Sequence, residues 1–284
     1  LGDVYKRQIE YNHITAPSTT GVFSSKEPSQ AALDGQNAAW KDSMNDNNVM
    51  IVTIARSASE NGTYQPGTAG VDPTQNLNQT DPLGLSDDER DLINAAVTAK
   101  ASNGGKVIVL LNNASAMEVQ EIQDNDGVDA ILQVGLPGGY GFYGVADILS
   151  GEVNPSGHTT ATFAANSLSA PSAENFGLHA YNYGSKTPRA AGDSFVSYNE
   201  GIYVGYRYYE TRYSDGVTDP AGTNALSSAG AFVGDTWNYD NEVCYPFGYG
   251  LSYTTFEKTI KSSSIPDPST WTPSTELSVT CLLY

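Results

Sequence analysis

The chain has 284 residues, of which 39% are apolar and only 16% are charged. This is the composition of a globular protein with long polar connections, long enough for one large domain or two smaller ones, and it excludes a disordered chain. The formal charge of −18 disfavours nucleic-acid and membrane partners, whereas neutral sugars or peptides are easier to accommodate. No apolar run reaches the length of a membrane span and no signal-peptide pattern is present, which leaves localisation open.

Both ends of the sequence resemble a sequencing-adapter scar. The opening LGDVYKRQ and the closing CLLY look like the two reading directions of a transposon-end adapter, so we expect residues 1–8 and 281–284 to be artefacts. Cys244 is then the only genuine cysteine, which predicts no internal disulfide. A lone thiol is more typical of a small buried apolar side chain than of a nucleophile.

The apolar run around residue 50 organises the first half of the chain. The letters VMIVTIA predict a buried strand at 49–55, and the spacing of apolar residues predicts a helix over 30–44 before it. The next residues, RSASE, end in Glu60, which we expect on a loop at the carboxyl end of that strand. Ligands gather at this edge of open α/β sheets, so Glu60 is a candidate for chemistry. A solvated surface glutamate is the alternative interpretation.

The following segment alternates helices with apolar strands. Ser86 begins a helix, because SDDE is a capping box and an apolar stripe follows it, and Gly104 closes that helix. The runs at 106–112 and 128–135 predict two further buried strands, with a short helix at 117–123 between them. This alternation predicts an α/β fold, with a largely parallel sheet covered by helices on both faces.

Motifs for cofactors and metals are weak. GYGFYG at 139–144 fits G-x-G-x-x-G, but the segment after its helix offers no acidic residue for a ribose, so we interpret the glycines as a tight strand-to-helix turn. DNDG at 124–127 lacks the alternate spacing of oxygen ligands and is better explained as a turn. The three histidines are widely scattered. No cofactor and no metal are predicted.

The segment at 195–213 alternates aromatic with polar residues, which predicts one or two strands. It contains Glu200 and Glu210, which rival Glu60 as candidate carboxylates. Ion pairs with the neighbouring Arg207 and Arg212 are the simpler explanation for both glutamates.

Four stretches resemble the landmarks of a known family: IARSASE, VDAILQVGLPGGYGFYGVADILSGEVNPSGHTTATF, NEGIYVGYRYYE and YPFGYGLSYTTF. In this order they look like the C-terminal α/β-sandwich domain of glycoside hydrolase family 3, the group that contains β-glucosidases and β-xylosidases. They span most of the chain between residues 49 and 256. The tail is similar to the start of the fibronectin type III-like module that follows this domain in many members. The resemblance thus assigns 9–250 to the sandwich, without its first strand, and 251–280 to the module.

The resemblance also implies a site. In this family a (β/α)8 barrel supplies an aspartate nucleophile within a Ser-Asp-Trp-like motif, and the sandwich supplies a glutamate acid/base on a loop after a strand. Residues 56–60 align with the family pattern Arg-x-Ser-Gly-Glu-Gly and imply that Glu60 is the acid/base. Ser59 and Asn61 replace glycines of the pattern, which affects the loop's conformation rather than the place of the carboxylate. Arg56 could orient that carboxylate in a substrate-binding site, or it could simply cap the strand end.

The chemistry implied is retaining hydrolysis of β-linked oligosaccharides or glycosides, without a cofactor. The sequence contains no Ser-Asp-Trp and no barrel, so we expect a fragment that needs the missing barrel of the same chain and is inactive alone. A non-catalytic sugar-binding or interdomain scaffold is the alternative, and a nicotinamide oxidoreductase is a third hypothesis. The sequence does not indicate which sugar is cleaved.

Overall fold

The structure, a computed structural model, describes residues 29–56, 83–174, 179–180, 194–218, 228–255, 257–264, 272 and 278–283. It divides into two compact units. The first unit comprises residues 1–142 and 159–249, and the second comprises 143–158 and 250–284.

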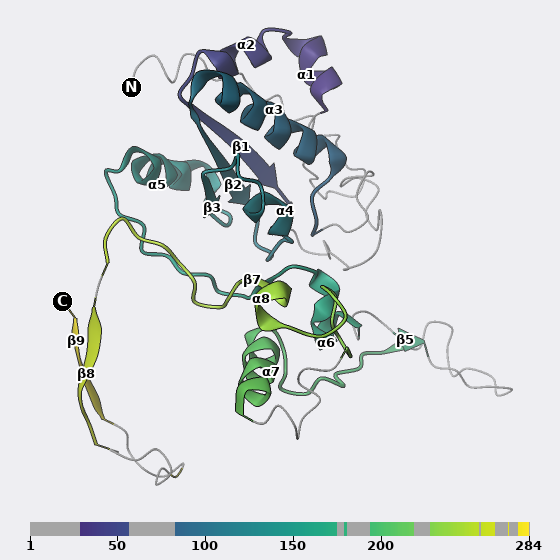
Figure 1. The fold of residues 1–284 in the computed structure, drawn as a ribbon, viewed down its shortest axis with the longest axis vertical. Helices are drawn as coiled ribbons and strands as arrows, with labels where there is room; N and C mark the ends of the chain where they lie inside the picture. Colours follow the sequence, from purple (N-terminus) through teal and green to yellow (C-terminus); the bar gives the residue numbers. More distant parts are fainter. Residues whose placement is uncertain are drawn as a thin grey trace, which may run out of the picture. The chain divides into compact units, whose positions relative to one another are not determined.

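The first unit contains a three-stranded parallel sheet, which lies beside helix α3 (Asp87–Asn103) (Figure 1). The sheet consists of β1 (Val49–Ala55), β2 (Lys106–Asn112) and β3 (Ala130–Gln133), in the order β1-β2-β3. The β1–β2 register pairs Val49 with Lys106 and continues without interruption to Ala55 and Asn112. The α/β fold with a parallel sheet and flanking helices is therefore confirmed.

Four helices accompany this sheet in the sequence: α1 (Gln30–Gln36), α2 (Trp40–Asn45), α3 (Asp87–Asn103) and α4 (Gln120–Gln123). The single helix predicted at 30–44 is thus two helices. The break has a local cause, because Asn37 adopts an extended backbone and its side-chain oxygen accepts a hydrogen bond from the backbone N–H of Ala39. Asparagine side chains compete in this way with helical hydrogen bonding.

Helix α3 begins and ends as its sequence predicts. The Ser86 hydroxyl accepts from the backbone N–H of Glu89 at 3.1 Å, and the Glu89 carboxylate accepts from the backbone N–H of Ser86 at 2.8 Å. This reciprocal capping box satisfies two backbone donors that a helix N-terminus otherwise leaves open. At the other end, Gly104 adopts φ 71°, the left-handed conformation that only glycine takes without strain.

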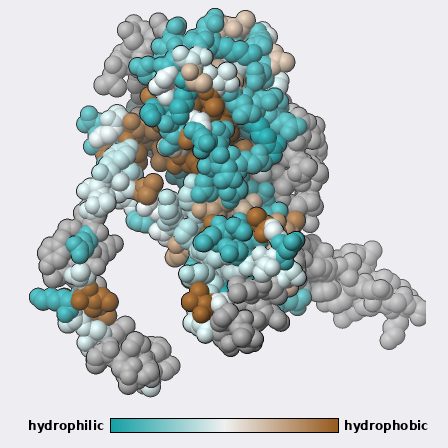
Figure 2. All heavy atoms as spheres, in the orientation of Figure 1, coloured by the Kyte–Doolittle hydropathy of each residue, from teal (hydrophilic) through white to brown (hydrophobic). Residues whose placement is uncertain are grey.

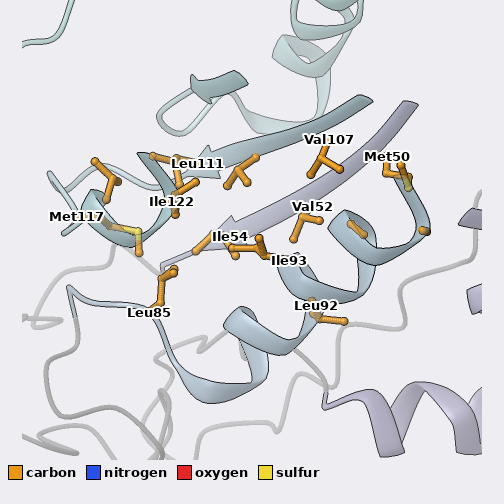
Figure 3. Packing of buried hydrophobic residues seen from close by; sticks show 14 of the residues in the cluster. Met50, Val52, Ile54, Leu85, Leu92, Ile93, Val107, Leu111, Met117 and Ile122 are labelled. Atoms are coloured by element: carbon orange, nitrogen blue, oxygen red, sulfur yellow. The ribbon is translucent and has the colours of Figure 1, made fainter. Parts of the chain in front are cut away.

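The core of the sheet half is aliphatic and lies between β1, β2 and α3 (Figure 3). Alternate residues of each strand point into it, as the two-residue period of a strand requires. The buried members shared by these three elements are Met50, Val52, Ile54, Val107, Val109, Leu111, Leu92, Ile93, Ala96 and Ala99. The sequence predicts a sheet covered on both faces. On the other face of β1, however, Val49 and Ile51 are 50% and 46% exposed, so this part of the sheet is less covered than predicted.

The glycine-rich stretch at 139–144 differs from the prediction. It lies inside helix α5 (Gly138–Ser150) rather than in the turn that precedes it. The positive φ angles belong to Gly135 (65°) and Gly138 (62°), which make the strand-to-helix connection. The tight turn was therefore predicted a few residues too late, because several glycines in a row leave its position ambiguous.

The structure corrects the strands predicted for the aromatic segment at 195–213. Only Ser194–Phe195 is a strand (β6), whereas Tyr206–Thr218 is a helix, α7. One face of α7 is buried through Tyr209, which packs with Trp237 and Val243 in a second, aromatic cluster. Alternating tyrosines favour a strand by propensity, but tertiary packing of this kind overrides such local preferences.

The remaining elements of the first unit are short: β4 (Phe163–Ala164), a 3-10 helix (Ser167–Ser169), α6 (Pro171–Glu174), β5 (His179–Ala180), α8 (Tyr239–Glu242) and β7 (Val243–Tyr245). Strand β4 pairs antiparallel with β7, and β5 pairs antiparallel with β6. The pairing of β4 with β7 connects the two clusters, because Phe163 of β4 belongs to the first cluster and Val243 of β7 to the aromatic one.

The second unit contains one antiparallel pair, β8 (Lys258–Ser263) with β9 (Val279–Leu283). The assignment of residues 251–280 to a fibronectin type III-like module remains a prediction, as do the sandwich boundaries 9–250 and the adapter origin of 1–8 and 281–284. In the same unit, Asn154 accepts hydrogen bonds from the Ser252 hydroxyl at 2.9 Å and the Tyr253 backbone at 2.7 Å.

The surface is mixed. Figure 2 shows a mostly hydrophilic face interrupted by hydrophobic patches. Among the described residues, the exposed large apolar side chains include several from the segment between β6 and α7, namely Val196, Tyr198, Ile202, Tyr203 and Val204. No helix of the described residues is long and apolar enough to cross a membrane.

Candidate active-site edge of the parallel sheet

The candidate site begins where β1 ends. Arg56 directly follows the last residue of β1, and its backbone N–H donates to the Asn112 carbonyl at the end of β2, at 3.4 Å. Glu60 stands four positions further along and lies outside the described residues, so its role stays a prediction. Carboxyl ends of parallel strands are where ligands gather in open α/β sheets, so the chain leaves β1 at the edge that suits a site.

Arg56 is buried, and its guanidinium is fully engaged in the interior. Both terminal nitrogens contact the carboxylate of Glu89, and the Nη2–Oε2 distance is 2.9 Å. Arg56 also donates to the carbonyl of Ala55 at 2.8 Å and to that of Gly84 at 2.7 Å. The two side chains are only 6% and 1% exposed, so the pair is shielded from solvent. Bidentate arginine–carboxylate pairs are among the stronger and more directional hydrogen-bonded pairs.

This ion pair joins the two ends of the segment that carries Glu60. Arg56 is the last described residue before 57–82, and Gly84 and Glu89 lie just after it, at the start of α3. Figure 3 shows Leu85 beside the end of β1, close to Ile54, so apolar packing accompanies the ion pair. The described residues that flank 57–82, Arg56 on one side and 84–89 on the other, are therefore held together at the carboxyl end of β1.

Of the two interpretations of Arg56, the geometry supports the structural one. Its contacts with the described residues, namely Ala55, Gly84 and Glu89, are to groups of the protein interior, which fits a residue that secures the strand end. A substrate-binding role for Arg56 stays a prediction. The pairing of Arg56 with Glu89 has no local signal in the sequence. Glu89 stands in the capping box of α3, and nothing in that pattern indicates a buried arginine 33 positions earlier.

The rival carboxylates do not lie on strands. Glu200 is in a turn, where its carbonyl accepts from the backbone of Tyr203 at 3.0 Å. Glu210 is on α7 and accepts a hydrogen bond from the Tyr239 hydroxyl at 2.6 Å. Burial, together with this hydrogen bond to a negative carboxylate, raises the pKa of Tyr239. The expected pairing with the nearby arginines is replaced for Glu210 by a tyrosine partner.

Arg212 also has aromatic neighbours. Its guanidinium lies 4.6 Å from the centroid of the Trp237 ring and donates to the Tyr208 hydroxyl at 2.6 Å. A planar guanidinium stacks favourably on an aromatic face. Arg212 therefore contributes to the packing of the aromatic cluster.

The remaining candidates for chemistry are the thiol of Cys244 and a metal site. Cys244 is buried, and burial raises the pKa of its thiol to about 12, which keeps it protonated and unreactive at neutral pH. Among the described residues, no group of three or more histidine, cysteine, aspartate or glutamate side chains could hold a metal ion.

Comparison with known proteins identifies the family to which the chain is similar. The glycosyl hydrolase family 3 C-terminal domain matches residues 8–206. Over 154 residues the chain is 35% identical to beta-glucosidase A of Butyrivibrio fibrisolvens, covering 54% of this chain and 14% of that protein. Over 165 residues it is 34% identical to thermostable beta-glucosidase B of Acetivibrio thermocellus, covering 58% of this chain and 16% of that protein.

A solved structure shows the same fold. Beta-glucosidase 3B from Thermotoga neapolitana, in complex with alpha-D-glucose, superposes with a TM-score of 0.53 at 33% identity, covering 80% of this chain and 24% of that chain. The chain thus spans less than a quarter of the length of these relatives. The family match covers well over half of the chain, and the chain therefore belongs to glycosyl hydrolase family 3, through its C-terminal domain.

Proposed function

We propose that this domain supplies the acid/base, Glu60, of a retaining β-glucosidase-like enzyme whose nucleophile lies in a separate barrel domain. The observation that carries the proposal is the edge at Arg56: β1 ends there, and the described residues on either side of the segment bearing Glu60 are joined by hydrogen bonds at that edge. The similarity to beta-glucosidases supports hydrolysis of β-linked glycosides.

The mechanism needs two carboxyl groups with opposite tasks. The aspartate of the barrel would attack the anomeric carbon while the Glu60 carboxyl protonates the departing glycosidic oxygen. The bond from the anomeric carbon to that oxygen breaks, and a covalent glycosyl-enzyme forms. Glu60, now a carboxylate, then takes a proton from water as the water oxygen attacks the anomeric carbon. The bond from that carbon to the aspartate breaks, which releases the sugar and restores the aspartate carboxylate and the protonated Glu60.

The sugar is a separate question. One relative of similar identity, 30% over 159 residues, is an exo-alpha-(1->6)-L-arabinopyranosidase from Bifidobacterium longum. Members this similar thus differ in the glycoside they cleave. We propose a β-glucoside because most of the similar relatives are beta-glucosidases.

The test compares leaving groups in the full-length enzyme. Glu60→Ala removes the acid, and general acid catalysis contributes on the order of 10²–10⁴-fold. We expect kcat/KM for a disaccharide to fall by about that factor, and kcat/KM for an aryl glycoside with a good leaving group to fall much less. Glu200→Gln is the matched control and should leave the leaving-group dependence unchanged. An equal loss on both substrates in Glu60→Ala would remove Glu60 from the mechanism.

The alternative is a non-catalytic sugar-binding or interdomain scaffold in an inactive protein. It predicts no turnover by the full-length wild type, with any leaving group. We also propose that the 284-residue chain alone is inactive, since covalent retaining catalysis needs both carboxyl groups. Turnover of an aryl β-glycoside by the purified chain, above a matched blank, would contradict this.

A further inference from the structure

We infer that Asn103, the last residue of α3, is a site of spontaneous deamidation that folding suppresses. Gly104 follows it, and an asparagine followed by glycine is a reactive pair, because glycine has no side chain to hinder attack by its backbone nitrogen. The inference goes beyond the proposed function and is independent of it, because it uses neither Glu60 nor any other part of residues 57–82.

The way in which α3 ends explains why this pair of residues stands here. Gly104 adopts φ 71°, a conformation that glycine takes without strain. The side-chain oxygen of Asn103 accepts a hydrogen bond from the backbone N–H of Gly105 at 2.8 Å, which closes the turn after the helix. The helix end is therefore built from the same two residues that make this point of the chain chemically labile.

The Asn103 amide also holds the connection between α2 and β1. Its nitrogen, Nδ2, donates to three backbone carbonyls: Met44 at 2.9 Å, Asn45 at 3.3 Å and Asn47 at 3.2 Å. In the next positions, the backbone N–H of Lys106 donates to the Asn48 carbonyl at 2.7 Å, where β1 and β2 begin side by side. One amide side chain thus links the end of α3 to the segment that leads into β1.

Deamidation at this site needs no reactant other than water. The backbone nitrogen of Gly104 attacks Cγ of Asn103 and loses its proton, the bond from Cγ to Nδ2 breaks, and ammonia leaves. The product is a cyclic succinimide, which water then opens. Cleavage of the bond from Cγ to the ring nitrogen gives aspartate. Cleavage of the bond from the backbone carbonyl carbon to that nitrogen gives isoaspartate, in which the main chain runs through Cγ.

The folded structure opposes the first step at both reacting groups. The backbone N–H of Gly104 donates to the Lys100 carbonyl at 2.7 Å, so the attacking nitrogen is already engaged. The hydrogen bonds of the Asn103 amide hold both its oxygen and its nitrogen, which keeps Cγ in place. The reaction therefore requires local or global opening, and its rate follows the population of the open state.

The product does not suit the folded site. A carboxylate has no hydrogens to donate, so the three carbonyls around Nδ2 would lose their donor and face a negative charge. That charge would also stand at the C-terminus of α3, where the helix dipole disfavours it. Isoaspartate further lengthens the main chain just before β2. Each unfolding event thus exposes Asn103 to a change that hinders refolding, which is a chemical route to irreversible loss of the folded protein.

The test follows deamidation of the 284-residue chain by peptide mapping, in native buffer and in guanidinium chloride at the same pH. We expect Asn103 to convert to aspartate and isoaspartate in the denaturant, and at least about tenfold more slowly in native buffer. Asn61, which also precedes a glycine, is the internal reference for the reaction in the denatured chain. A smaller difference at Asn103, or no conversion there while Asn61 converts in the denaturant, would overturn the inference.

Two variants test the consequence for the fold. Asn103→Asp places the product's carboxylate at the site and should lower the midpoint of urea unfolding. Asn94→Asp is the matched control, because it adds the same charge at an exposed position of the same helix, and it should lower the midpoint less. Failure of Asn103→Asp alone to fold would be the same result in a stronger form. A midpoint for Asn103→Asp no lower than that of Asn94→Asp would overturn the claim that the product hinders folding.

Discussion

The two hydrophobic clusters of the first unit differ in the kinds of side chain that they bury. The sheet half, which comprises β1, β2 and α3, buries mainly aliphatic side chains. It also contains the buried ion pair between Arg56 and Glu89. The aromatic half buries Tyr209 and Trp237 and leaves polar groups without partners among the described residues, including the Trp237 indole N–H and one oxygen of Glu242. The first part is therefore held by aliphatic packing and one buried ion pair, and the second by aromatic packing and by hydrogen bonds such as the one between the Tyr209 and Ser169 hydroxyls.

The largest effect is expected at the buried ion pair. Glu89→Ala leaves the Arg56 charge buried without its carboxylate, which typically costs about 3–5 kcal/mol of unfolding free energy. The matched control is Glu121→Ala, which breaks the exposed pair between Glu121 and Arg90 at 2.6 Å. Exposed pairs contribute about 0.2–1 kcal/mol. Urea unfolding of both variants measures the contrast, and similar losses would show that the Arg56 pair is not the anchor of the β1 end.

The next effect concerns the aliphatic core. Leu111→Ala removes a side chain that is 1% exposed near the carboxyl end of β2, and we expect a loss of about 2–5 kcal/mol of unfolding free energy, from lost burial and the cavity left behind. Ile51→Ala changes the half-exposed face of β1 and should cost clearly less. Equal losses in urea unfolding would mean that the open face of β1 is covered in solution.

The aromatic half should respond to alkaline pH. Burial raises the pKa of Tyr209 to about 12, so the folded state holds this proton more tightly than the unfolded state does. The resulting stabilisation is complete below about pH 10 and is lost as pH rises towards 12, by roughly 1.4 kcal/mol per pH unit. Tyr209→Phe should remove this part of the fall, as measured by urea unfolding at pH 9 and pH 11.5. Parallel pH dependences of wild type and variant would contradict the assignment.

The smallest effect is chemical. Because burial raises the pKa of the Cys244 thiol to about 12, it should react slowly with a disulfide reagent at pH 8 in the folded protein and rapidly in urea. A Cys281→Ser background isolates this thiol. Fast labelling of the folded chain would show that Cys244 is accessible.

The same contrast explains what the sequence could predict. β1, β2 and α3 were predicted closely because periodicity, a capping box and Gly104 act locally. Helix α7 was mistaken for strands because its tyrosines favour a sheet locally, and only contacts with Trp237, 28 positions after Tyr209, make it a helix with a buried face. For the same reason the partner of Arg56 was missed, although the position of Arg56 at a strand end was predicted. Long-range partners leave no local pattern.

The central claim, that Glu60 is the acid/base of a retaining glycosidase, is tested most directly by chemical rescue of Glu60→Ala in the full-length enzyme. Without a base, the covalent glycosyl-enzyme formed from an activated aryl β-glycoside should accumulate and give a burst. Azide needs no deprotonation, so it should restore turnover and yield the β-glycosyl azide. The account predicts that product, with retained configuration. A variant that shows no burst, ignores azide and yields no glycosyl azide would contradict it.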